Sequence, residues 1–331
     1  MKSKSKVVIG CTIASALVLC GAFLFATSKV VESAGLGPDV CLTLRVVDDC
    51  GQPVPDAECE GWIYLDGAPD DGKSYCATTD KNGIAWVRGR CNVDISVSVH
   101  KDTYYDSDSK VDVTKMAWDA ASGRRRTDQV NIEQTVRLRR IKKPVAGGSR
   151  FISQKIPSYG TWLGYDMELA DWTKPNGKGL HADMLLKFTA REVSGSDFGY
   201  KMEISFTNNP YAGVYKREKD GFSAFKYDYS ADTNATFAST IEFETVYNRD
   251  VTRRKWNVLD ENSYLVFRTR TSVDSEGKLV SAHYGWIAGH WTGHWMFQQS
   301  HEIILPGVFF NQKPNDANLE EDVSQSIDKR F

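Results

Sequence analysis

The stretch Val93-Asp94-Ile95-Ser96-Val97-Ser98-Val99-His100 alternates apolar and polar residues without a break. Successive side chains of a β-strand point to opposite faces of a sheet, so this pattern predicts a strand with one buried face and one solvated face. Gly, Asp, Asn and Pro separate it from similar stretches, which is typical of turns between strands. We therefore predict a small β-sandwich over residues 39–143, with further strands at 40–47, 58–65, 76–79, 84–88 and 129–141.

The rest of the chain repeats this chemistry on a larger scale. Tyr200, Met202, Ile204 and Phe206 share one strand face, and few stretches show the 3.6-residue period of a helix. We expect a larger antiparallel β-sandwich or sheet over residues 150–320, after a linker at 145–149 and before a flexible polar tail at 321–331. Its predicted long strands are 182–193, 200–207, 240–247, 263–273 and 279–289.

The composition is that of an ordinary globular protein of about two domains, with 331 residues, 41% hydrophobic and 25% charged. The 41 basic and 43 acidic residues give a net charge of −2. Such a balance provides no basis for a nucleic-acid partner.

The N-terminus carries a signal for export. Lys2, Lys4 and Lys6 precede residues 7–26, which contain no charge. Twenty residues are enough for a membrane-spanning helix, while small residues near 26–28 and 31–33 also suit a signal peptidase. Residues 1–33 are thus either a cleaved signal peptide or a signal-anchor helix. Both alternatives place the remaining chain outside the cytoplasmic membrane, in the periplasm, at the cell surface or secreted.

Cysteine usage fits an oxidising compartment. Beyond the N-terminal segment, every cysteine falls in the first module, and wide gaps make a zinc ribbon or a redox Cys-x-x-Cys pair a poor fit. We expect disulfides among them, with one thiol left over and the connectivity open. The disulfide candidates are Cys41, Cys50, Cys59, Cys76 and Cys91.

The first module resembles the carboxypeptidase regulatory-like, or CnaB-type, β-sandwich. The residues that carry the resemblance are Asp48 to Ala57, Thr79 to Gly83 and Tyr104-Tyr105. The resemblance implies a non-catalytic spacer or binding unit. Some members cross-link a strand Lys to an Asn, but the first strand here, 41–47, contains no Lys.

The second module is similar to a domain of uncharacterised exported bacterial proteins that follows the same kind of regulatory-like module. The similarity rests on Asp171 to Gly179 with Ala182-Asp183, and on Pro314 to Glu320. It implies no known activity. Asp316, Asn318 and Glu320 have oxygens that suit calcium, but the loop lacks the Gly and the spacing of an EF-hand, so we expect a capped turn here instead.

His290 and His294 form the best candidate for a metal site. A His-x-x-x-His pair binds zinc when it lies on a helix, but Gly289 and Gly293 favour a strand here. On a strand the two residues lie roughly 13 Å apart, at about 3.3 Å per residue, so distant partners would have to complete a site.

Aromatic residues surround this pair, at Tyr284, Trp286, Trp291 and Trp295. An exposed aromatic row stacks on sugar rings, so these residues are candidates for carbohydrate binding. Close packing of two sheets explains the same pattern without a ligand.

The sequence has no Gly-x-Ser-x-Gly elbow and no phosphate-binding Gly-rich loop. We therefore expect a non-catalytic envelope protein with a binding or structural role, recognising a glycan or a protein, and no cofactor. The alternative is a secreted hydrolase, with or without a metal ion, that has its site in the second module.

Overall fold

The computed structural model is built of β-strands and turns, which confirms the predicted mainly β class. It divides into two compact units, Met1–Ile141 with Phe222–Ala224, and Lys142–Gly221 with Phe225–Phe331. Within the described residues no helix is long and apolar enough to span a membrane. The predicted export segment, 1–33, lies outside them. The structure describes residues 37–66, 71–119, 124–125, 128–146, 149–194, 197–207, 209–221, 223–247, 255–257, 259–289, 302–322 and 324.

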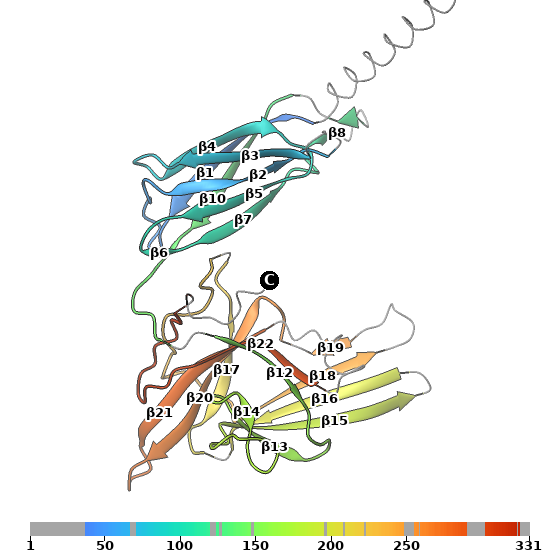
Figure 1. The fold of residues 1–331 in the computed structure, drawn as a ribbon, viewed down its shortest axis with the longest axis vertical. Helices are drawn as coiled ribbons and strands as arrows, with labels where there is room; N and C mark the ends of the chain where they lie inside the picture. Colours follow the sequence, from blue (N-terminus) through green and yellow to red (C-terminus); the bar gives the residue numbers. More distant parts are fainter. Residues whose placement is uncertain are drawn as a thin grey trace, which may run out of the picture. The chain divides into compact units, whose positions relative to one another are not determined.

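The first unit is a sandwich of two sheets (Figure 1). Leu42 and Leu44 from one sheet share a buried core with Val97 and Val99 from the other. One sheet has the order β10-β1-β4, formed by β10 (Val130–Arg137), β1 (Asp39–Val47) and β4 (Ile84–Arg90). The other has the order β3-β2-β5-β7, formed by β3 (Gly72–Thr78), β2 (Glu58–Tyr64), β5 (Asp94–His100) and β7 (Ser107–Asp112). Short pairs join β6 (Tyr104–Tyr105) to β11 (Arg139–Arg140) and β8 (Trp118–Asp119) to β9 (Arg124–Arg125).

Three turns with the pattern Asp-x-x-Gly share one construction, at Asp48–Gly51, Asp80–Gly83 and Asp274–Gly277. In each, the aspartate Oδ1 accepts the N–H groups two and four residues later at 2.8–2.9 Å. Each glycine has a positive φ between 71° and 79°, which costs a residue without a Cβ little. The turn chemistry read from the sequence therefore sets where the flanking strands end.

The second unit also has two main sheets. Phe188 and Ile204 of one sheet pack in a common core with Phe267, Ile287 and Leu305 of the other. The five-stranded sheet has the order β12 (Arg150–Lys155), β22 (Glu302–Phe310), β21 (Leu279–Ala288), β20 (Ser263–Val273) and β17 (Gly213–Glu218). The six-stranded sheet has the order β14 (Asp171–Trp172), β13 (Trp162–Asp166), β15 (Met184–Ser194), β16 (Asp197–Ser205), β18 (Thr240–Tyr247) and β19 (Lys255–Asn257).

The five-stranded sheet is covered on its other face as well. Tyr264, Trp286 and Phe309 form a second core there with Leu319. Tyr227 stacks on Trp286 with ring centroids 3.6 Å apart. The Trp286 indole N–H donates to the Leu319 carbonyl at 3.2 Å. This double coverage explains why β20 is almost entirely buried.

The stretch 314–320 is a ladder of side chains that cap the backbone. Asp316 accepts the N–H of Asn318 at 3.1 Å, and Asn318 accepts the N–H of Glu320 at 2.9 Å. The buried Glu320 carboxylate in turn accepts the N–H groups of Lys142 and Lys143 at 2.8 and 2.6 Å. These oxygens are used by the chain itself, so the structure favours the capped turn over the calcium alternative.

A buried ion cluster joins the two sheets of the second unit. Arg270 lies at a bulge of β20 with a φ of +48°. Its guanidinium bonds both carboxylate oxygens of Asp183, at 2.8 and 2.9 Å, and one oxygen of Asp166 at 3.2 Å. Glu168 is the third carboxylate bonded to it. Asp183 and Asp166 are fully buried, so Arg270 supplies the positive charge that their burial requires.

The surroundings of Asp166 favour its charged form. Burial alone would raise the pKa of this carboxyl, but the N–H groups of Leu169, His181 and Leu180 donate to it, and Arg270 lies beside it. Together these contacts hold the pKa of Asp166 below its ordinary value. Because two of these N–H groups belong to the loop after the 171–179 stretch, the ion cluster also fixes that loop.

Arg270→Met is expected to lower the free energy of unfolding by about 3–5 kcal/mol, because it leaves buried carboxylates without a counter-charge. Urea unfolding followed by tryptophan fluorescence measures the loss. The matched control is Arg217→Met, which removes a solvent-exposed ion pair with Asp228 at 2.7 Å and should cost less than about 1 kcal/mol. Equal losses in the two variants would show that the cluster does not tie the sheets together.

Candidate functional site

The outer face of the three-stranded sheet in the first unit is a candidate binding surface. On β4, Ala85 and Val87 point into the core, whereas Trp86, Arg88 and Arg90 point outward. Trp86 is 54% exposed, although a tryptophan in a strand usually packs its large ring into a core. The same alternation that builds the core therefore presents a tryptophan to solvent.

Strand register places polar side chains in rows beside this tryptophan. Thr43 on β1 lies opposite Trp86 on one side and Glu133 of β10 on the other. In the next row, Cys41 lies between Arg88 and Asn131. Paired residues share one face of a sheet, so hydroxyl, carboxylate, guanidinium and amide groups lie on the same surface as the indole.

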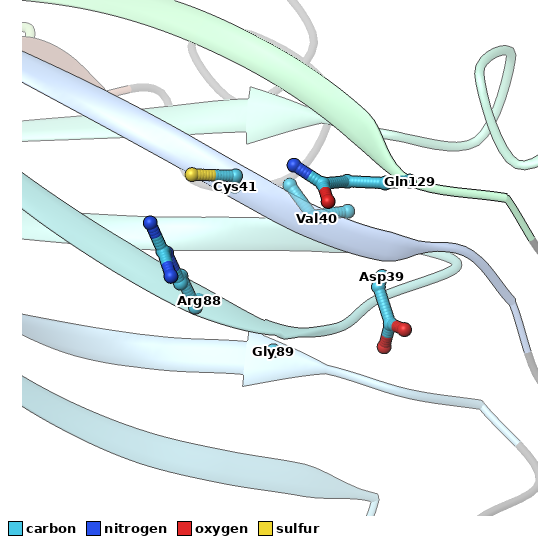
Figure 2. Close-up of a pocket in the computed structure, with 6 residues that line it drawn as sticks. All are labelled: Asp39, Val40, Cys41, Arg88, Gly89 and Gln129. Atoms are coloured by element: carbon cyan, nitrogen blue, oxygen red, sulfur yellow. The ribbon is translucent and has the colours of Figure 1, made fainter.

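A cavity of about 360 Å³ opens on this surface, next to the Arg88 row (Figure 2). Figure 2 shows the Cys41 thiol and the Arg88 side chain on neighbouring strands, with Gln129 and Asp39 at the other end. The Gln129 amide donates to Asn131 Oδ1 at 2.8 Å, which orients both side chains. The residues that line the cavity are Asp39, Val40, Cys41, Arg88, Gly89 and Gln129.

This arrangement is suited to binding. It offers hydrogen-bond donors, acceptors and one aromatic ring on a rigid sheet. Within the described part of the chain, no group of three His, Cys, Asp or Glu residues could hold a metal ion.

The five cysteines among the described residues of the first unit, Cys41, Cys50, Cys59, Cys76 and Cys91, are free thiols. The register places Cys59 opposite Ala77 and Cys76 opposite Glu60, so the two thiols point to opposite faces of one sheet. The Cys91 thiol is turned inward, 3.3 Å from the carbonyl oxygens of Tyr64 and Asp94. This structure contains no disulfide among the described cysteines. For Cys59 and Cys76 the strand register keeps the two thiols apart.

Four of these thiols fall into two reactivity groups. Burial raises the pKa of Cys59 and of Cys91 to about 11, whereas Cys50 and Cys76 are exposed. Only the thiolate reacts readily. At pH 8, iodoacetamide should modify Cys50 and Cys76 in the native protein and spare Cys59 and Cys91, as peptide mass mapping would show.

Unfolding in guanidinium is the control for this prediction, since all the thiols should then react. The pKa direction also fixes the sign of the pH effect: the buried pair should stay protected until the pH approaches 11. If Cys50 or Cys76 reacted only after a reductant was added, the free-thiol arrangement would be contradicted.

Two of the four aromatic residues predicted to stack on a sugar are buried in this structure. Tyr284 and Trp286 are 5% and 1% exposed, because residues of the second core cover that face of the sheet. Trp291 and Trp295 lie outside the described residues, as do the metal candidates His290 and His294.

Trp86 is an exposed aromatic residue that is not among the candidates predicted from the sequence. Its signal is present in the order Ala85-Trp86-Val87-Arg88-Gly89-Arg90, where the tryptophan shares its parity with two arginines and not with the apolar residues. An aromatic residue in the polar phase of an alternating strand predicts an exposed ring.

No family model matches the chain, and neither does any curated protein. Solved structures with similar folds include a catechol 1,2-dioxygenase from Acinetobacter, at 16% identity and a TM-score of 0.24 over 31% of this chain. The chain spans about half of that enzyme, 53% of its length.

A DUF3823 family protein from Parabacteroides merdae is 10% identical, with a TM-score of 0.22 over 75% of this chain and 96% of its own. The major pilin subunit of Bacillus cereus is 9% identical, with a TM-score of 0.22 over 74% of this chain and 67% of its own. Likenesses at this level carry no argument about activity or partners.

Proposed function

We propose that this protein is a non-catalytic binding protein that works outside the cytoplasmic membrane and recognises a glycan through the outer face of the sheet β10-β1-β4. The observation that carries the proposal is Trp86, exposed on a strand and surrounded by polar side chains. The β-sheet fixes its backbone, so little order is lost when a ligand stacks on the ring.

The chemistry of the face suits a sugar. One side of a pyranose ring is lined by C–H groups, which pack against an indole, while its hydroxyl groups need both donors and acceptors. Arg88 and Asn131 supply donors, Glu133 and Thr43 supply acceptors, and all four lie within two rows of Trp86. The adjoining cavity gives space for a substituent of the sugar.

A protein partner fits this face less well. Stable protein interfaces bury about 800 Å² on each side around an apolar centre. Here Trp86 is the large exposed apolar side chain among the outward residues of the three strands, and its neighbours carry charges. The surface therefore favours a small, polar ligand with one apolar face.

Two sequence features support the setting of this function. The first unit resembles regulatory-like β-sandwich modules, which imply a spacer or binding unit. Residues 1–33 have the charge pattern of an export signal or anchor, so a glycan of the cell envelope or its surroundings is the ligand class that this location would provide.

The test compares Trp86→Ala with Trp118→Ala. Trp118 is similarly exposed, at 52%, but lies on β8, which pairs with β9 and not with the three-stranded sheet. After a glycan array identifies an oligosaccharide ligand, calorimetry should show binding weakened by roughly twofold to tenfold in Trp86→Ala, since ring stacking contributes about 0.5–1.5 kcal/mol. Trp118→Ala should bind like the wild type.

Both variants should keep the melting temperature of the wild type, because neither side chain belongs to a core. If Trp86→Ala bound as well as the wild type, the sheet face would not be the glycan site. Elemental analysis of the full chain tests the hydrolase alternative separately: about one zinc or calcium per chain would favour it over a non-catalytic role.

A further inference from the structure

A second cavity, of about 500 Å³, lies in the second unit and has a different character. It is bounded by β20, by the turn between β20 and β21, and by the segments around Tyr211 and Thr233. This volume is within the range of small-molecule sites. The residues that line it are Tyr211, Thr233, Arg268, Glu276, Gly277, Lys278 and Leu279.

Arg268 is the buried group of this cavity, with 7% of its surface exposed. Its Nε donates to the Tyr211 carbonyl at 2.7 Å and its Nη1 to the Thr233 carbonyl at 3.3 Å. The guanidinium carbon lies 3.9 Å from the centre of the Phe237 ring, on which it stacks. These contacts hold the plane of the guanidinium in one orientation.

The charge of Arg268 has no acidic partner in the described part of the chain. Among those residues no carboxylate forms an ion pair with it, and both of its hydrogen-bond acceptors are neutral carbonyls. Arg270, two residues later, is bonded to three carboxylates. A guanidinium has five N–H donors, so Arg268 retains donors for an anion.

The bulge of β20 explains this contrast. Residues two apart on a regular strand share a face, but the positive φ of Arg270 and the register shift after Thr269 break that rule. Arg270 points towards Asp183, whereas Arg268 stacks on Phe237 beside the second core. The two arginines thus serve different faces of one sheet.

The walls of the cavity add a ring and a second cation. Tyr211 has a φ of +61°, and its hydroxyl donates to the Gly277 carbonyl at 2.8 Å. This bond holds the half-exposed ring at the rim. Lys278 and Glu276 line the same cavity. Two cations and one carboxylate leave the lining with a net charge of +1, which matches a singly charged anion better than a doubly charged one.

We propose that this cavity binds a small carboxylate-bearing ring compound, with its carboxylate on the Arg268 guanidinium and its ring against Tyr211. A carboxylate is planar and singly charged, and it accepts two parallel N–H bonds from an arginine. Sugar acids and aromatic acids share this chemistry. The site is separate from the Trp86 surface, and neither proposal depends on the other.

The experiment titrates the full chain with sodium glucuronate and sodium benzoate at constant ionic strength, followed by calorimetry. Glucose and benzyl alcohol are the neutral counterparts, and inorganic phosphate serves as the doubly charged anion when the titrations are run at pH 8. We expect at least one carboxylate to bind at least tenfold more tightly than its neutral counterpart and than phosphate. Preference for glucuronate indicates a sugar acid, and preference for benzoate indicates an aromatic acid.

Arg268→Gln should weaken this binding by at least tenfold, because charge-assisted hydrogen bonds are lost. The matched control Arg217→Gln removes an exposed arginine of β17 and should leave binding unchanged. Tyr211→Ala and Lys278→Gln alter exposed rim residues, so they test the site even if Arg268→Gln does not fold. Each should weaken binding by about twofold to tenfold.

Three results would overturn the proposal. The first is that neither carboxylate binds better than its neutral counterpart. The second is that Arg268→Gln, or both rim variants, bind the carboxylate as tightly as the wild type. The third is that phosphate binds more tightly than either carboxylate, which would contradict the charge match of the lining.

Discussion

A guanidinium held among three carboxylates joins the two sheets of the second unit. Asp166 and Asp183 belong to the six-stranded side, where they also bind backbone N–H groups, and Arg270 reaches them from β20 of the five-stranded side. Their charges are out of contact with water, so the arginine cannot move away without leaving them uncompensated. The bulge that turns Arg270 towards these acids also separates it from Arg268. One backbone irregularity thus determines both the connection between the sheets and the face on which the second cavity lies.

Most of the strands could be predicted because their residues alternate. β5 and β18 lie within one residue of the predicted bounds, since a period of two is a local property of the chain. The three Asp-x-x-Gly turns are also local features of the sequence, because the aspartate acceptor and the glycine act within five residues. The segments that cover each face of a sheet could not be predicted from the sequence. Trp286 is buried because residues about 60 positions earlier, around Tyr227, fold over it, and no local pattern records such a contact.

The cysteines also show that contacts between distant residues cannot be predicted from local sequence. The sequence places these cysteines together in one module, and this clustering predicts disulfides. A disulfide, however, requires that two Cβ atoms face each other at about 4 Å. In the sheet β3-β2-β5-β7 that condition depends on the strand register. Cys59 is paired with Ala77, the residue next to Cys76, so the thiols of Cys59 and Cys76 lie on opposite faces of the sheet. The sequence shows that these cysteines lie in one module, but the strand register determines whether Cys59 and Cys76 can form a disulfide.

The two candidate sites share one property, which is clear when Trp86 is compared with Trp286 and Arg268 with Arg270. Trp86 and Trp286 both occupy alternating strands, yet only Trp286 has chain packed over it. Arg270 and Arg268 lie on one strand, yet only Arg270 meets carboxylates of the described chain. In each pair one member has its interactions completed within the fold, and the other has a rigid backbone and unused capacity. A fixed side chain with unused capacity is prepared for a ligand, because binding then costs little reorganisation. The exposed indole of Trp86 suits a ligand with an apolar face among hydroxyl groups. The buried guanidinium of Arg268 suits a ligand with a negative charge. The two units are therefore expected to recognise different chemical groups.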